Sequence, residues 1–166
     1  MRLWVARTCS PTRQRLLRWR KRCWRSCRAN PDVWSDFAGG TRPMPRVESL
    51  SAVQAVIQSY IDACARGDVL ALRALFHHSA ILSGYLAGEL VTGSPEPFFT
   101  AVGANPAPLD SGLRYIARID TVHIDGRIAT AVLRETGYMG MDFVNHFQLL
   151  EVDGQWHIVA KLFESL

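Results

Sequence analysis

The run Tyr138–Phe163 constrains the fold of this 166-residue chain more than any other segment. It contains two stretches typical of β-strands, and the Asp153-Gly154 pair between them is the strongest short signal for a hairpin. Gly154 supplies the positive φ that a type I′ turn requires. A polar residue stands beside an apolar one along most of both arms, which predicts a sheet with one solvated and one packed face. Such a sheet can form a cup or a half-barrel.

The positive charge of the chain is confined to its first 46 residues. Residues 1–46 hold twelve Lys or Arg and two acids, a net charge of +10, whereas residues 47–166 hold seven and thirteen, a net charge of −6. The domain at 47–166 is therefore not expected to bind nucleic acid. Clustered like charge with Pro and Gly predicts a disordered leader. Two other interpretations stay open: a mis-called start, with Met44 as the true first residue, and a basic amphipathic arm that touches membrane or RNA.

Neither hydropathy nor cysteine usage points to a membrane or an oxidising compartment. No run approaches the ~18 apolar residues of a transmembrane helix, and Arg interrupts the apolar pairs of the leader. The four cysteines do not resemble a disulfide framework, so we expect the cytoplasm. Cys23 and Cys27 have no His nearby, and no His pair has ligand spacing on a helix. We expect no metal and no cofactor.

Apolar spacing predicts three helices and six strands in the domain. The expected helices are 50–65, 69–76 and 95–102, and the expected strands are 80–86, 89–92, 113–124, 127–138 and the two arms of the last hairpin. Ser49 or Ser51 is expected to cap the first helix, which Gly67 ends, and Asp68 to cap the second. The prediction is an α+β domain of order α-α-β-β-α-β-β-β-β, with a curved antiparallel sheet wrapped around three helices.

A series of short motifs runs through residues 48–164. They are Gly67-Asp68, Phe76-His77 with Ala80, Gly84-Tyr85-Leu86, Gly88-Glu89, Asn105-Pro106, Gly140-x-Asp142-Phe143, Phe147-Gln148-Leu149, Asp153–Ile158 and Lys161-x-Phe163. Their order resembles the nuclear transport factor 2-like superfamily, and within it the putative lumazine-binding group. The resemblance implies a SnoaL-like and ketosteroid-isomerase-like cone fold with one deep pocket, often dimeric.

The resemblance leaves the function open. Similar folds include ketosteroid isomerase, scytalone dehydratase and polyketide cyclases, but also plain binding modules. Relatives often carry an Asp just after the Phe-His motif, where this chain has His78-Ser79. Because no acid occurs between Asp68 and Glu89, a catalytic carboxylate at that place is excluded.

Asp142 and His146 form the most enzyme-like pair in the sequence. Their i, i+4 spacing in a strand puts both on one side, roughly 13 Å apart at ~3.3 Å per residue. The gap shrinks if Asp142 lies in the preceding loop. The simpler interpretation is that Asp142 caps a turn and His146 lies on an exposed sheet face.

Aromatic residues from different elements are the candidate ligand contacts. In a cone fold, some of the four tyrosines Tyr60, Tyr85, Tyr115 and Tyr138 could converge and offer phenol donors to a polar planar ligand, with Phe98 as an apolar wall. The alternative for these residues is ordinary core packing. His77 follows the second helix, where it either contacts the ligand or caps the helix end.

Three functions follow from these observations. The first is a pocket protein for a small polar or aromatic molecule, resembling the putative lumazine-binding group. The second is a cofactor-free lyase or isomerase that uses Asp142 or a His as base and a Tyr as donor. The third is a dimerisation module whose open sheet face binds a protein. For the pocket protein we also expect a homodimer through that face.

Overall fold

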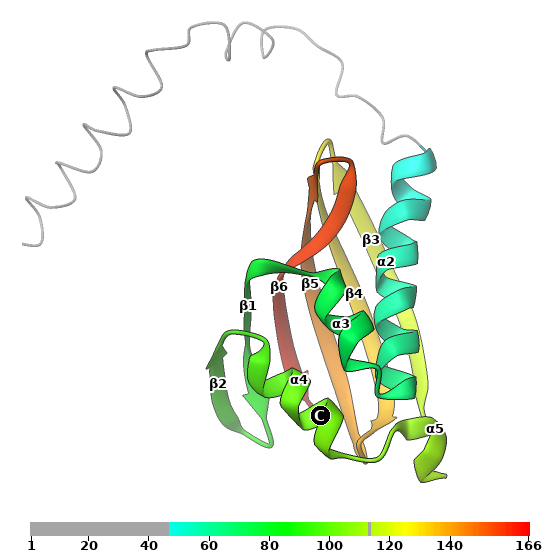
Figure 1. Cartoon of the computed structure of the whole chain (residues 1–166), viewed down its shortest axis with the longest axis vertical. Coiled ribbons are helices and arrows are strands. Elements are labelled where there is room, and N and C mark those ends of the chain that lie inside the picture. The colour runs from blue at the N-terminus through cyan, green and yellow to red at the C-terminus, as the bar shows by residue number, and fades with distance from the viewer. Residues whose placement is uncertain (1–46, 113) are drawn as a thin grey trace, which may run out of the picture. The chain divides into compact units, whose positions relative to one another are not determined.

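The computed structural model describes residues 47–112 and 114–166, and it has the predicted α+β order with one additional short helix (Figure 1). The leader and the Met44 alternative lie outside the described residues. The helices are α2 (Val47–Arg66), α3 (Val69–Leu75), α4 (Glu96–Ala104) and α5 (Pro108–Ser111). The strands are β1 (Phe76–Leu86), β2 (Glu89–Gly93), β3 (Ile116–Asp125), β4 (Ile128–Tyr138), β5 (Met141–Val152) and β6 (Gln155–Ser165).

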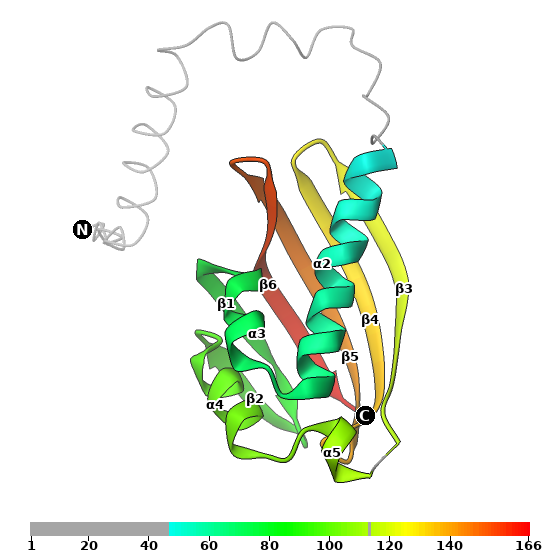
Figure 2. The ribbon, with the colours of Figure 1, turned by 45° about the vertical axis from the view of Figure 1, so that its right-hand side comes forward.

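The strands form one six-stranded sheet in the order β2-β1-β6-β5-β4-β3. All neighbours are antiparallel except β1 and β6, which run parallel, so the expected antiparallel sheet has one parallel joint. This joint arises because α4 and α5 carry the chain from the β2 edge to the β3 edge, from which the last four strands return. Figure 2 shows α2 lying over the face formed by β3, β4 and β5.

The predicted turn of the last hairpin and the predicted cap of the second helix are both present. Asp153 and Gly154 have φ angles of 51° and 78°, which confirms the type I′ hairpin between β5 and β6. Asp68 caps α3, because its Oδ1 accepts a hydrogen bond from the Ala71 amide at 2.9 Å. The expected cap of the first helix is wrong. Because α2 already includes Val47, Ser51 lies inside it and donates to the Glu48 carbonyl oxygen.

Two elements differ from the sequence-based expectation. β1 begins at Phe76 rather than Ala80, because Phe76 pairs with Ile158 before the register shifts at Ile81. The additional helix α5 lies outside the three helices expected from apolar spacing, and Pro108 is its first residue. A helix tolerates Pro there because the first amide of a helix has no intrahelical acceptor.

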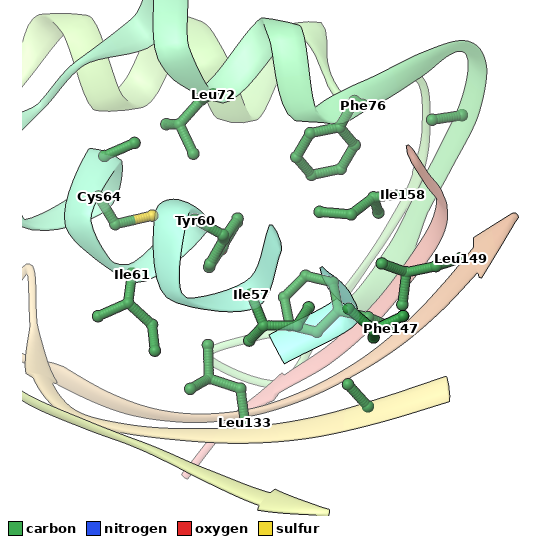
Figure 3. Close-up of a cluster of buried hydrophobic side chains, with 14 of the residues drawn as sticks. Ile57, Tyr60, Ile61, Cys64, Leu72, Phe76, Leu133, Phe147, Leu149 and Ile158 are labelled. Carbon is green, nitrogen blue, oxygen red and sulfur yellow. The ribbon is translucent and has the colours of Figure 1, made fainter. Parts of the chain in front are cut away.

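The core lies between α2 and the concave face of the sheet (Figure 3). Residues at helical spacing on α2 are completely buried: Val53, Ile57, Tyr60 and Cys64. They pack against sheet residues that include Leu133, Phe147, Leu149 and Ile158. Burying one such large apolar side chain stabilises the fold by about 1.5–3 kcal/mol. Trp156 is buried as well.

Candidate functional site

A cavity of about 330 Å³, here called the inner cavity, opens between α4, the β1–β2 hairpin and the concave side of the sheet. Its apolar lining consists of Leu82, Leu86, Val91, Pro97, Phe98, Ala101, Met139, Met141, Phe143 and Phe163. The polar lining consists of Thr92, Ser94, Glu135, Tyr138 and Lys161. Ligand pockets have this character, with mostly apolar walls and a few polar groups that fix orientation.

Lys161 is the basic group of the inner cavity, although it is only 5% exposed. Its Nζ donates a hydrogen bond to the Tyr60 hydroxyl at 2.6 Å and lies 4.5 Å from the centre of the Phe98 ring. Burial lowers the pKa of Lys161, and the charges of Glu135 and Cys64 oppose that effect. Within the described part of the chain, no carboxylate lies within 4.0 Å of Nζ. This environment favours the neutral amine more than water does.

Glu135 is the acidic group of the inner cavity and is 2% exposed. Its Oε1 accepts a hydrogen bond from the Tyr115 hydroxyl at 2.6 Å, and its Oε2 accepts one from Asn145 Nδ2 at 2.7 Å. These two donors compensate the loss of water around a buried carboxyl group. The carboxyl is therefore held in one orientation.

Two buried polar atoms beside these groups have no hydrogen bond. They are the hydroxyl of Tyr138 and Oδ1 of Asn145. Burial is the main cause that raises the pKa of Tyr138, and the Cys64 thiol contributes in the same direction. The Tyr138 hydroxyl and this thiol nevertheless do not have the geometry of a hydrogen bond. Burial also raises the pKa of Cys64, to about 12, so the thiol stays protonated. A buried hydroxyl without a partner in a cavity wall is available to a ligand.

Strand alternation puts the two charged residues inside. In the regular part of β4 every second residue is buried, namely Ala129, Ala131, Leu133 and Glu135, so Glu135 continues an apolar series. Lys161 of β6 lies opposite Phe147 of β5, which is also buried. The sequence therefore does contain a signal for these site residues: a charged residue stands at a strand position where the alternation predicts a buried apolar one. Glu135, Asn145 and Lys161 are absent from the sequence-based prediction, whose catalytic candidates are Asp and His residues.

The structure brings four of the predicted ligand-binding aromatics to this region. Tyr138 and Phe98 line the inner cavity. Tyr60 and Tyr115 lie behind it, hydrogen-bonded to Lys161 and Glu135 respectively. Stacking extends this group, because the Tyr60 and Phe98 ring centres are 6.2 Å apart.

The structure places the other two predicted ligand contacts away from the inner cavity. Tyr85 is 49% exposed and pairs with Leu90 on the β1–β2 hairpin. His77 lies in β1, where its Nδ1 is 2.7 Å from the Ser79 hydroxyl oxygen and its ring contacts that of His78. Neither residue is part of the cavity lining.

Asp142 and His146 lie on the solvent side of β5. Asp142 Oδ1 accepts a hydrogen bond from the Gly137 amide at 2.8 Å, across the β4–β5 turn, and His146 is exposed opposite Leu162. The inner cavity is lined from this strand by Met141 and Phe143 instead. Because side chains alternate along a strand, the even positions of this stretch of β5 face away from the cavity.

Two absences hold for residues 47–112 and 114–166, the part of the chain that the structure describes. No group of three or more His, Cys, Asp or Glu residues there could hold a metal ion. No described helix is long and apolar enough to cross a membrane.

The convex side of the sheet, here called the outer face, carries several exposed apolar residues. They are Ile81, Tyr85, Ile116, Ile128, Leu150 and Leu162. Ile128 and Leu150 are cross-strand neighbours and line a second hollow of about 250 Å³ together with Val159.

A curved sheet that holds an apolar cavity with a polar end against its helices is the architecture of the nuclear transport factor 2-like superfamily. The putative lumazine-binding family matches residues 48–164, and the chain belongs to that family. The expected fold and superfamily are thereby confirmed.

Three relatives illustrate the similarity. The chain is 26% identical over 117 residues to a protein named aldolase FrzH from Cladobotryum sp., covering 69% of this chain and 89% of that one. A nuclear transport factor 2-like protein of unknown function from Silicibacter pomeroyi is 28% identical, with a TM-score of 0.66 and coverage of 74% and 100% of the two chains. A similar protein of unknown function from Methylobacillus flagellatus is 24% identical, with a TM-score of 0.69 and coverage of 76% and 99%.

Proposed function

We propose that the inner cavity binds a small molecule with an apolar or aromatic body and one polar group. The observation that carries this proposal is the lining itself: about 330 Å³ of mainly apolar wall that ends at Glu135, Tyr138 and Lys161. A buried amine and a buried hydroxyl without a hydrogen bond destabilise the fold, so stability alone does not explain why both lie at one end of a cavity.

Each part of the lining has a role in this proposal. Phe98 and Phe143 supply flat apolar contact to the body of the ligand. The Tyr138 hydroxyl and Lys161 Nζ supply donors to its polar group, and Tyr60 and Tyr115 hold the two charged side chains in place. Of the predicted ligand contacts, Tyr60, Phe98, Tyr115 and Tyr138 are thus retained.

Native mass spectrometry of the purified full chain tests the proposal by searching for a co-purified small molecule. Naphthalenemethanol serves as a defined probe, and we expect saturable binding in a fluorescence titration. Ala101→Trp should abolish that binding, because Ala101 lines the inner cavity at its α4 wall. Ala104→Trp is the matched control, on the same helix but outside the lining. Equal binding by both variants would contradict the proposal.

A second function, a cofactor-free lyase or isomerase, is favoured by the acid–base groups of the same cavity. Glu135 is a carboxyl base, and Tyr138 is a donor for developing negative charge on a carbonyl oxygen. These residues take the roles that sequence reasoning gave to Asp142 or His146 and a tyrosine. A relative named aldolase agrees with a reaction beside a carbonyl group.

Proton exchange next to a carbonyl tests this second function. The wild type should accelerate exchange of solvent deuterium into the methyl group of acetonaphthone, followed by proton NMR. Glu135→Gln should lower that rate by about 10²-fold or more, whereas Glu151→Gln, outside the inner cavity, should leave it unchanged. A wild-type rate equal to that of buffer would exclude the reaction for this ketone.

We further propose a homodimer through the outer face, as expected from the sequence. Exposed apolar residues gathered on one face are typical of an interface, and a two-fold dimer would pair the same patch on both subunits. Leu162→Arg on this face should convert a dimer to a monomer in analytical ultracentrifugation. Leu70→Arg, on an exposed position of α3, is the control. A monomeric wild type would refute the dimer.

The cytoplasm is the proposed location, on the basis of the sparse cysteines in the sequence. Cys64, the cysteine of the domain, is a buried free thiol, which a reducing compartment preserves. Cell fractionation with an antibody against the domain tests this location, and recovery in a secreted fraction would refute it.

A further inference from the structure

Lys161 is the sole lysine between residues 47 and 166. The other six basic residues of that range are arginines, and the chain has one more lysine, Lys21. Arginine keeps its charge under all ordinary conditions, whereas a buried lysine can lose its proton and become a nucleophile. The one amine side chain of the domain is thus also its most deeply buried basic group, and it lies in the wall of the inner cavity.

Aromatic rings surround Nζ and keep water away from it, and their faces also attract a positive charge. Phe98, Tyr60 and Phe163 place their ring centres 4.5, 5.1 and 5.6 Å from it. Its one hydrogen bond goes to the Tyr60 oxygen at 2.6 Å, which fixes the direction of the amine. Burial lowers the pKa of Lys161, as expected for a basic group removed from water.

Other groups of the inner cavity match the needs of a carbonyl compound. The Tyr138 hydroxyl is buried, has no hydrogen bond and lines the same cavity. It can donate to a carbonyl oxygen, while the carboxyl of Glu135 can accept and return a proton. The apolar lining would exclude most of the water that reverses imine formation.

We propose that Lys161 forms an imine with an aldehyde or ketone held in the inner cavity. This inference rests on the proposed binding function and names the substrate class and the reacting atom. The Nζ lone pair adds to the carbonyl carbon, and the π electrons of the C=O bond move to oxygen. One amine proton is transferred to that oxygen, which gives a carbinolamine. Loss of the hydroxyl and the second amine proton as water leaves the C=N bond, with no oxidant or reductant needed.

Within this proposal Tyr60 is a positioning residue, because it touches Lys161 and lies behind the inner cavity. An imine withdraws electrons from the neighbouring carbon, which is the property needed to make or break a carbon–carbon bond there. The proposal therefore connects the buried lysine to lyase chemistry without requiring that a complete turnover occurs.

Reductive trapping tests the proposal on the full-length protein. Naphthaldehyde and sodium cyanoborohydride are added near neutral pH, so that hydride converts any imine to a stable secondary amine. Intact mass spectrometry should show one added naphthylmethyl group. Peptide mapping should place it on Lys161, which then resists tryptic cleavage. Because burial lowers the pKa of Lys161, a larger fraction of its amine is neutral, so Lys161 should be labelled faster than Lys21.

Variants and a non-carbonyl analogue separate the possible outcomes. Lys161→Met should lose the adduct, and Lys21→Arg should keep the adduct, while binding of naphthalenemethanol is measured on the wild type and on Lys21→Arg. If the wild type binds naphthalenemethanol but carries no adduct on Lys161, the imine is overturned and the binding function stands. If neither the alcohol nor the aldehyde binds, the proposed function fails together with the imine.

Discussion

At the scale of single residues, Lys161 is a group that the fold holds at a cost. A buried lysine side chain without a carboxylate partner loses hydration that one hydrogen bond to Tyr60 replaces only in part, whichever protonation state it has. Glu135 is better satisfied, because both of its oxygens accept hydrogen bonds. Proteins keep such destabilising groups where function needs them, so removing Lys161 should separate stability from activity.

Replacing Lys161 with Met should raise the free energy of unfolding by about 1–2 kcal/mol near neutral pH, since an apolar side chain of similar length fills the site. Between its lowered native pKa and the ordinary value of 10.5, the unfolded chain binds the proton that the folded chain has lost. The free energy of unfolding of the wild type therefore rises with pH in that window. The difference between Lys161→Met and the wild type should become smaller as the pH rises. Urea titrations at several pH values measure this.

The control for that experiment is Arg66→Met, which replaces an exposed cation at the end of α2 and should change stability by less than about 0.5 kcal/mol. A difference between the wild type and Lys161→Met that stays constant up to high pH would show that Lys161 titrates normally.

Two Tyr→Phe substitutions should have opposite effects. Tyr138→Phe removes a buried hydroxyl without a hydrogen bond and should raise stability by up to about 1 kcal/mol, while it weakens binding of naphthaldehyde. Tyr115→Phe removes a donor from Glu135 and should lower stability by about 1–3 kcal/mol. Thermal unfolding of both variants gives the comparison. Equal shifts would mean that the Tyr138 hydroxyl is paired in solution.

Sequence reasoning reached only part of the site. Tyr60, Phe98, Tyr115 and Tyr138 were named from the sequence because aromatic residues on different elements were expected to converge. Glu135 was not, although its phase along the strand matches that of Leu133. Which residue lies across a cavity depends on the register between strands, and one bulge changes that register, as between Gln148 and Leu149 of β5.

At the scale of elements, the parallel joint between β1 and β6 depends on a close approach. Gly84 lies opposite Phe163, and a Cβ atom at position 84 would be 2.0 Å from the Phe163 carbonyl oxygen. That oxygen belongs to the backbone, so relief would require moving one strand. The joint also carries Leu82 and Lys161, which are register partners and both line the inner cavity.

Gly84→Ala should lower the free energy of unfolding by about 3 kcal/mol or more, because the added methyl group overlaps backbone atoms. Ser83→Ala, one residue earlier in the same strand, should change it by less than about 0.5 kcal/mol. Denaturant unfolding gives both values. A stable Gly84→Ala protein would mean that the two strands lie further apart than the structure shows.

The elements were more predictable than the site because they follow from local chemistry. The Asp153-Gly154 turn and the Asp68 cap each act within a few residues. The early start of β1 at Phe76 was missed because its partner Ile158 is more than 80 residues away in the chain. Such a pairing leaves no local signal.

At the scale of the whole molecule, the buried hydroxyl and thiol groups should set an alkaline limit to stability. Burial raises the pKa of Cys64 from 9.0 to about 12, and it raises the pKa values of Tyr60, Tyr115 and Tyr138 above their usual 10.0. Above these ordinary values the folded chain keeps protons that the unfolded chain has lost, so stability falls as pH rises.

The loss from Cys64 begins near pH 9, where the gain from Lys161 opposes it, and the net loss of stability steepens above pH 10, at about 1.4 kcal/mol per pH unit for each unopposed group. Up to about pH 10.5, the rise in the free energy of unfolding that Lys161 causes offsets the fall caused by one of the four groups. Urea unfolding monitored by circular dichroism measures the slope, which Tyr138→Phe should reduce by one proton. A flat profile up to about pH 11 would contradict the burial of these groups.

Deleting residues 1–43 should leave the domain folded with an unchanged melting temperature. The buried core cluster of the described residues runs from Val53 to Ile158. Thermal unfolding of the shortened and full-length proteins, monitored by circular dichroism, provides the comparison. A large fall in melting temperature would show that the leader packs on the domain.

Lys161 and Leu162 are consecutive residues of β6 that point to opposite sides of the sheet, one into the inner cavity and one onto the outer face. A single peptide unit therefore joins the reactive amine to the surface where a second copy would dock. Any slide or twist of this strand displaces both side chains at once. If the proposed dimer forms through the outer face, occupancy of the cavity and self-association would be linked through this strand, and by thermodynamic reciprocity each would alter the other by the same factor.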